Sequence, residues 1–262
     1  MRRRTPRRIC SETDMEIKKR EILFGAIIAL VMVAVGFFIS GAISEHMQAN
    51  VEQYTTAVRI EDPDQFSYGM KTDFGNALVY GTLQAEQPVI RPELDGEYVA
   101  VRMVKERYTM HTRTVTYTDS DGNTRTRTET YWTWDYAGEN KWVSDTILFL
   151  GSRFATNQFN LSAQYRRLNL KDKSRYLYES SHVRYYFTGI PTAFDATIHA
   201  DLRAGGIGQQ VEVFPDKTPA EVVETQIHEQ KVSSLAFWMI WISLIVIIEV
   251  LFVTLENRWL DD

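Results

Sequence analysis

The side chains that could support catalysis in this chain are few and scattered. The five histidines lie far apart, at His46, His111, His182, His199 and His228. No two of them have the HxxxH or HExxH spacing that places a pair of zinc ligands on one face of a helix. The chain also lacks a GxSxG nucleophile motif and a P-loop. We therefore predict a protein that is not an enzyme and that carries no cofactor or catalytic metal.

Two alternative sites stay open. His182, His199 and Asp195 would form a dispersed hydrolase site if the fold brought them together. Asp119 and Asp121 offer carboxylates to calcium, but the segment lacks the later bidentate glutamate of an EF-hand loop. We favour a hairpin turn for this acidic segment.

The cysteine content excludes several kinds of site. Cys10 is the only cysteine. A single thiol excludes an intramolecular disulfide and any zinc site made of several cysteines. Because Cys10 precedes the first apolar run, a cysteine nucleophile on the outer side of a membrane is also excluded.

Two long apolar runs near the ends of the chain predict its architecture. Residues 22–43 carry no charge, and residues 235–255 carry one, Glu249. About 20 apolar residues in a helix cross the roughly 30 Å hydrocarbon core of a bilayer. We predict transmembrane helices over residues 22–44 and 234–255, with an extracytoplasmic domain over residues 45–233.

The flanking charges predict the orientation. Residues 1–21 hold eight cations, and the next cation after the first run is Arg59. The positive-inside rule places this basic segment in the cytoplasm, and two spans return residues 256–262 to the same side. We expect an integral protein of the plasma or inner membrane. A cleaved signal peptide is the alternative, although its usual apolar core has only about 7–15 residues. Translation from Met1 or Met15 stays open.

The two spans carry a few small or charged side chains. Small residues recur four positions apart, at Gly25 and Ala29 and again at Gly36 and Ser40, which predicts close helix packing with the second span or another copy. Glu249 lies six residues before the end of its run. It either reaches towards the head groups or is protonated there, or it serves in ion conduction through a channel-like oligomer or in a contact between helices.

The region between the spans reads mainly as strand. Threonine stands at nearly every second position in residues 108–118 and again in 124–134, around an Asp/Gly/Asn-rich link. This pattern predicts a long hairpin arm over residues 108–134. The arm is either a stiff surface ribbon or a contact surface for a protein partner, and the candidate contact residues are Tyr117, Tyr131, Trp132 and Trp134. Trp132 and Trp134 share a face, which packs on the domain body if the arm makes no contact.

Other segments predict further elements. We expect residues 188–194 to form a loop between two strands. Thr218, Pro219 and Glu221 have the pattern of a capped helix start, and this helix should run straight into the second span. The first span should continue as helix over residues 45–59. Further strands are expected over residues 77–85, 98–107, 181–187, 196–203 and 210–214.

The charge of the middle region excludes one class of partner. Residues 45–232 hold 20 Lys and Arg against 26 Asp and Glu. A nucleic-acid-binding face needs a net basic patch. We therefore expect no nucleic acid among the partners, which should be the lipid bilayer and either a protein partner or another copy of the chain.

Residues 77–134 resemble two known groups. The pattern rests on Gly81, Pro88, Pro92, Gly96, Val99, Val101, Glu106 and Arg107. It resembles the strand pattern of the GIDE-type membrane domain and of the LUMA-like transmembrane proteins, and the threonine-rich hairpin is also similar to the latter. The resemblance implies a β-rich extracytoplasmic domain beside membrane spans. No cysteine follows Cys10, so the RING of GIDE-type ligases is absent, and LUMA-like proteins have more than two spans.

Together these features predict an α+β membrane protein in which two transmembrane helices flank an extracytoplasmic β-rich domain with a long hairpin arm. The preferred function is a non-enzymatic scaffold or interaction protein. A channel-like oligomer and an outer-face hydrolase are the alternatives.

Overall fold

The structure, a computed structural model, describes residues 19–260, with side chains over residues 23–255. The predictions for residues 1–18, including Cys10, and for the end of the C-terminal tail lie outside the described residues. The chain divides into two compact units. One holds the helical segments up to Glu52 and from Thr225, and the other is Gln53–Glu224.

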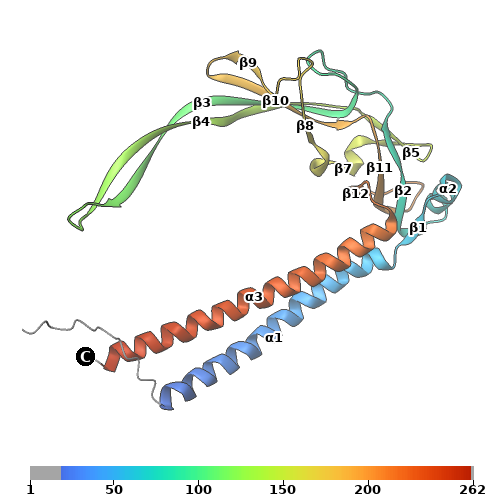
Figure 1. Cartoon of the computed structure of the whole chain (residues 1–262). Helices are drawn as coiled ribbons and strands as arrows, with labels where there is room; N and C mark the ends of the chain where they lie inside the picture. Colours follow the sequence, from blue (N-terminus) through green and yellow to red (C-terminus); the bar gives the residue numbers. More distant parts are fainter. Residues whose placement is uncertain (1–18, 261–262) are drawn as a thin grey trace, which may run out of the picture. The chain divides into compact units, whose positions relative to one another are not determined.

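The helical unit consists of two long helices that lie side by side (Figure 1). They are α1, Lys19–Thr55, and α3, Pro219–Leu260. Both are long and apolar enough to cross a membrane, and most of their large apolar side chains are exposed. As predicted, α3 runs into the second apolar run without a break. The first span also continues as helix, but only to Thr55 and not over all of residues 45–59, because Val58–Ile60 pairs as a strand.

The start of α3 is capped as the sequence predicts. The Thr218 N–H donates a hydrogen bond to Glu221 Oε2 over 2.8 Å, and the Glu221 N–H donates to Thr218 Oγ1 over 3.4 Å. This reciprocal pair satisfies N–H groups that have no partner within the helix. The hydrogen bond from the Thr218 backbone lowers the pKa of Glu221.

A seven-stranded sheet forms one half of the β-rich unit (Figure 1). Its main path runs β6-β5-β2-β11-β12-β7, with β1 parallel to β2. The strands are β1 Val58–Ile60, β2 Gly75–Ala85, β5 Thr146–Phe149, β6 Ser152–Ala155, β7 Phe159–Asn160, β11 Ala193–Leu202 and β12 Val211–Pro215.

A five-stranded sheet forms the other half. Its order is β4-β3-β10-β8, with β9 paired to β10. The strands are β3 Tyr98–Thr118, β4 Thr124–Val143, β8 Arg166–Leu168, β9 Leu177–Ser180 and β10 Val183–Pro191. The predicted loop over residues 188–194 is wrong, because β10 continues to Pro191 and β11 begins at Ala193 in the other sheet. The chain therefore changes sheets within this segment.

Three short helices complete the β-rich unit: α2, Pro63–Lys71, and the 3₁₀ turns η1, Thr156–Gln158, and η2, Ser162–Gln164. Asp62 caps α2 by accepting a hydrogen bond from the Gln65 N–H over 2.9 Å.

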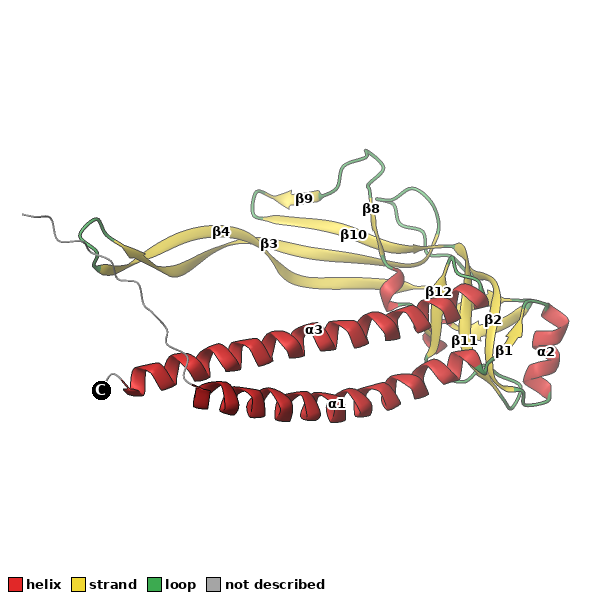
Figure 2. Cartoon of the chain, turned by 60° about the horizontal axis from the view of Figure 1, so that its bottom comes forward, coloured by secondary structure: helices red, strands yellow, loops and turns green. Residues whose placement is uncertain are grey.

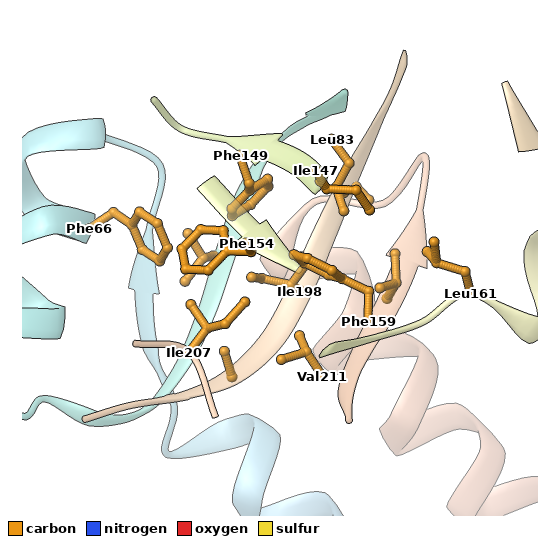
Figure 3. Close-up of a cluster of buried hydrophobic side chains, with 14 of the residues drawn as sticks. Phe66, Leu83, Ile147, Phe149, Phe154, Phe159, Leu161, Ile198, Ile207 and Val211 are labelled. Carbon is orange, nitrogen blue, oxygen red and sulfur yellow. The ribbon is translucent and has the colours of Figure 1, made fainter. Parts of the chain in front are cut away.

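Aromatic and branched side chains fill the core of this unit (Figure 3). Phe66 of α2 packs edge-to-face against Phe149 of β5 and Phe154 of β6, with ring centroids 5.6 and 6.0 Å apart. A smaller cluster around Phe187 and Val101 lies under the five-stranded sheet. Each sheet therefore packs on a buried cluster, and the arm extends from the five-stranded sheet.

Candidate functional site

The hairpin arm, residues 108–134, extends past the third strand of its sheet (Figure 2). The pairing of β10 with β3 ends at Val183 and Arg107. Residues 109–118 then pair only with β4, and within the described chain the outer edge of β4 has no partner strand along its length. The arm is therefore a two-stranded ribbon with open edges.

The two faces of the arm differ in charge. Four cross-strand pairs of threonine lie on one face: Thr112 with Thr130, Thr114 with Thr128, Thr116 with Thr126, and Thr118 with Thr124. All eight are exposed. Met110 and Trp132 continue the same face towards the domain, because side chains alternate along a strand. This threonine face carries no charge from Tyr108 to Trp134.

The opposite face is charged. Arg113 and Arg127 both donate hydrogen bonds to Glu129. These two bonds lower the pKa of Glu129, and the bond from Arg127 has the larger effect. His111 Nε2 lies 2.6 Å from Asp135 Oδ2. The two arginine–glutamate pairs and the His111–Asp135 contact make this face polar.

The four aromatic residues expected to make contacts do not form one surface. Trp132 and Trp134 lie on the threonine face, whereas Tyr117 and Tyr131 lie on the charged face. Tyr131 stacks on the His111 ring, with centroids 5.5 Å apart. Trp132 is 49% exposed and remains open to a partner.

Trp134 belongs to a stack of rings and guanidinium groups at the root of the arm. The Arg184 Cζ atom lies 4.1 Å from the centre of the Trp134 ring and 3.9 Å from that of Tyr176. Arg184 Nε also donates a hydrogen bond to Glu106 over 2.6 Å. Tyr108 packs on both tryptophans of the threonine face. This root stack fixes Trp134 to the domain body, in line with one of the two alternatives for its face, but its partners Arg184 and Tyr176 were not predicted from the sequence.

The acidic segment at the tip closes the hairpin. Asp119 Oδ1 accepts hydrogen bonds from the N–H groups of Asp121 and Asn123, and Oδ2 accepts one from Arg125 Nε over 2.7 Å. The bond from Asn123 is the main cause that lowers the pKa of Asp119. Among the described residues, no group of three or more His, Cys, Asp or Glu is arranged to hold a metal ion.

The dispersed hydrolase set does not come together. His182 lies at the turn between β9 and β10 of the five-stranded sheet, whereas Asp195 and His199 lie on β11 of the other sheet. The latter two are four positions apart along the strand, which is about 13 Å. Asp195 accepts a hydrogen bond from Thr82 instead.

His199 belongs to a partly buried polar cluster. Its Nε2 atom lies 2.7 Å from Asn76 Oδ1 and its Nδ1 atom 3.6 Å from Glu212 Oε2. Tyr54 packs on the His199 ring and donates a hydrogen bond to Glu212 over 2.6 Å. Burial lowers the pKa of His199 below its ordinary value of 6.5, against the opposing effect of Glu212.

This cluster predicts an acid-sensitive β-rich unit. In the folded chain His199 takes up a proton less readily than in the unfolded chain, so its contribution to stability is complete above about pH 6.5 and is lost as the pH falls below that value. We expect the urea midpoint to fall from pH 7.5 to 5.5, and to fall less in His199→Gln. His182→Gln, which changes an exposed histidine, should behave as wild type. An equal fall in all three proteins would contradict this role of His199.

The small residues of the first span all lie on one stripe of α1. Gly36 is buried, and Gly25, Ala29 and Ser40 are half-buried, among the exposed apolar side chains of the helix. A Cβ atom at Gly36 would lie 2.7 Å from Trp241 Cδ1 of α3. Of the two partners predicted for the small residues, the structure therefore shows the second span of the same chain.

Glu249 lies against this stripe. A Cβ atom at Gly25 would lie 2.7 Å from Glu249 Oε2, and Glu249 Oε1 is buried without a hydrogen-bond partner among the described residues. A role in lining a pore would require this side chain to turn away from α1.

Comparison with known proteins gives no match to a family model, a curated protein or a solved structure. The resemblance of residues 77–134 to the LUMA-like and GIDE-type proteins therefore stays an expectation. Any function must follow from the geometry of the chain itself.

Proposed function

We propose that this chain is a membrane-anchored scaffold without enzymatic activity, and that it assembles with further copies of itself through the hairpin arm. The observation that carries the proposal is the threonine face, an exposed and uncharged surface on an otherwise acidic domain. The exposed Met110 and Trp132 at its base add apolar area to it.

The anchor is the helical unit. Because α1 and α3 expose apolar side chains along lengths that match a bilayer, we place both within the membrane. The cations of residues 1–21 favour cytoplasmic termini in the plasma or inner membrane, which puts the β-rich unit outside the cytoplasm. Labelling of Cys10 by an impermeant maleimide in intact cells would contradict this orientation.

The arm itself indicates that it has a partner. A two-stranded ribbon is only marginally stable in water, and its open edges are templates for pairing. The arm buries little apolar surface of its own, because both its faces are exposed towards the tip. Burial of one face against a partner would stabilise it.

A second copy is the occupant that best fits this face. The threonine face offers methyl and hydroxyl groups but no charge, so a charged partner gains nothing from it. Two such faces are self-complementary, because threonine methyl groups pack and hydroxyl groups can both donate and accept hydrogen bonds. Packing about a two-fold axis would bury the same face on both copies. Confinement of both copies to one membrane raises their effective concentration.

A pair of lysine substitutions at neighbouring positions tests this assembly. Thr114→Lys places a charge on the threonine face, and we expect it to weaken self-association at least about tenfold, or about 1.4 kcal/mol, because two like charges meet at the interface. Val115→Lys places the same charge on the opposite face and should leave association unchanged. Light scattering of the full chain in detergent at several concentrations measures both.

Three outcomes would refute the proposal. They are a purified wild-type chain that is monomeric at all concentrations, equal association of the two lysine variants, and unchanged association after deletion of residues 109–133. A monomer that captures another protein through the arm would replace self-assembly by partner binding.

A further inference from the structure

A pocket of about 570 Å³ lies within the β-rich unit, where its two sheets meet. Residues of β3, β4 and β10 line one side of it, and residues of β6, η1, β7 and η2 line the other. Its buried apolar lining consists of Ala100, Phe159, Leu161 and Ile190. This pocket is separate from the arm and has no part in the function proposed above.

Two cations lie side by side in the wall of the pocket. Arg102 and Lys141 are a direct cross-strand pair of β3 and β4, so their side chains share a face. The Arg102 Cζ atom lies 4.1 Å from the centre of the Tyr165 ring, which holds the guanidinium plane in place. Both cations approach the Glu139 carboxylate only to 3.8 and 3.9 Å, which is too long for a hydrogen bond. Their donors therefore keep hydrogen-bonding capacity for a ligand.

Two buried polar atoms of the lining have no hydrogen-bond partner among the described residues. They are Arg102 Nε and the hydroxyl Oγ1 of Thr156. Thr156 is only 6% exposed, and its N–H is already used by the Asp145 carbonyl over 3.0 Å. An unpaired buried polar group destabilises the fold. An acceptor that reached Thr156 Oγ1 and the Arg102 guanidinium would remove that penalty.

The charges around the pocket favour a ligand with a single negative charge. Arg102 and Lys141 supply two positive charges, whereas Asp145 in the lining and the nearby Glu139 supply two negative ones. A phosphate dianion would be repelled by these carboxylates. A single carboxylate suits the planar fork of the guanidinium and brings only one charge.

We propose that this pocket binds a small organic acid in which one carboxylate is attached to an apolar body. The carboxylate accepts hydrogen bonds from Arg102, Lys141 and the Thr156 hydroxyl. The apolar body rests on Phe159, Leu161 and Ile190 between the sheets. A ligand of this kind gains both charge-assisted hydrogen bonds and buried apolar area.

A matched pair of ligands tests the site in the full-length protein in detergent. N-acetyl-L-phenylalanine carries the carboxylate, and N-acetyl-L-phenylalaninamide has nearly the same shape without the charge. We expect calorimetric titration to show the acid binding at least about tenfold more tightly than the amide. Binding of neither compound at millimolar concentration, or equal binding of both, would overturn the proposal.

Variants locate the binding within the pocket. Arg102→Gln should weaken binding of the acid at least about tenfold and Lys141→Gln about threefold, because each removes a charged donor. Because the Lys141 side chain is half-exposed, Lys141→Gln should fold normally even if Arg102→Gln is unstable. Arg153→Gln removes a surface cation paired with Glu86 and should not change binding. Unchanged affinity in both pocket variants, or an equal loss in Arg153→Gln, would refute the site.

Discussion

Replacement of Gly36 by leucine should force the two long helices apart, whereas the same replacement at Gly41 should leave their packing intact. A Cβ atom at Gly36 would stand 2.7 Å from Trp241 Cδ1, closer than real Cβ atoms approach other atoms, and at Gly41 it would meet nothing within 4 Å. The indole cannot move away freely, because Trp241 Nε1 donates a hydrogen bond to the Met32 carbonyl over 3.0 Å. In the membrane placement proposed above, that N–H would find no water to replace its partner.

The expected loss of stability for Gly36→Leu is about 1–3 kcal/mol, the usual cost of overpacking a close contact. Gly41→Leu serves as the control because both changes bring the same gain in helix propensity. Gly25→Leu should have a smaller effect than Gly36→Leu, since the atom it meets is the end of the flexible Glu249 side chain. Unfolding in mixed detergent, followed by tryptophan fluorescence, measures all three. Equal effects at Gly36 and Gly41 would show that the helices do not pack through this stripe.

The elements that the sequence predicted well are those encoded by local patterns. The two apolar helices follow from the length of their apolar runs, and the hairpin follows from the alternation of threonine. The Thr218 and Glu221 capping pair was also predicted, because its whole signal lies within four residues. Each of these signals lies in contiguous residues, so it can be recognised without knowledge of the tertiary packing.

The errors arose where tertiary contacts decide the structure. Gly189 and Pro191 look like loop residues, yet Gly189 belongs to β10 because only a glycine fits there: a Cβ atom would lie 2.7 Å from Leu168 Cδ1 and 3.0 Å from the Ala100 carbonyl oxygen. The helix α2 was not predicted, although Asp62 and Pro63 stand at its start. Their pattern, a capping aspartate before proline, was a recognisable helix start.

The candidate sites show the same division. The aromatic residues of the arm could be found from the sequence, and alternation along β4 already separates Tyr131 from Trp132 and Trp134. The face on which Tyr117 lies depends on the register of β3 and β4. The root stack joins Trp134 of β4 to Tyr176 and Arg184, which lie much further along the chain. The pocket draws Arg102 and Thr156 from strands and turns of different sheets. A single sequence carries no signal for such long-range juxtapositions.

Replacement of Arg184 by alanine should destabilise the root of the arm strongly. Its side chain is only 15% exposed and lies between two aromatic rings while it bonds to Glu106. Loss of the guanidinium removes both cation–π contacts and leaves the largely buried Glu106 carboxylate unpaired. We expect a loss of about 2–4 kcal/mol in the free energy of unfolding, together with faster hydrogen exchange in residues 108–118.

Arg184→Lys separates the two contributions. Lysine keeps the positive charge opposite Glu106 but has no plane to stack between Trp134 and Tyr176, so its stability should lie between those of alanine and arginine. Arg113→Ala is the matched control. The Arg113 side chain is 66% exposed in its pair with Glu129, and exposed pairs of this kind contribute less than about 1 kcal/mol to stability. If Arg184→Ala costs no more than Arg113→Ala, the arm is held by its backbone ladder alone, and the root stack does not fix its direction.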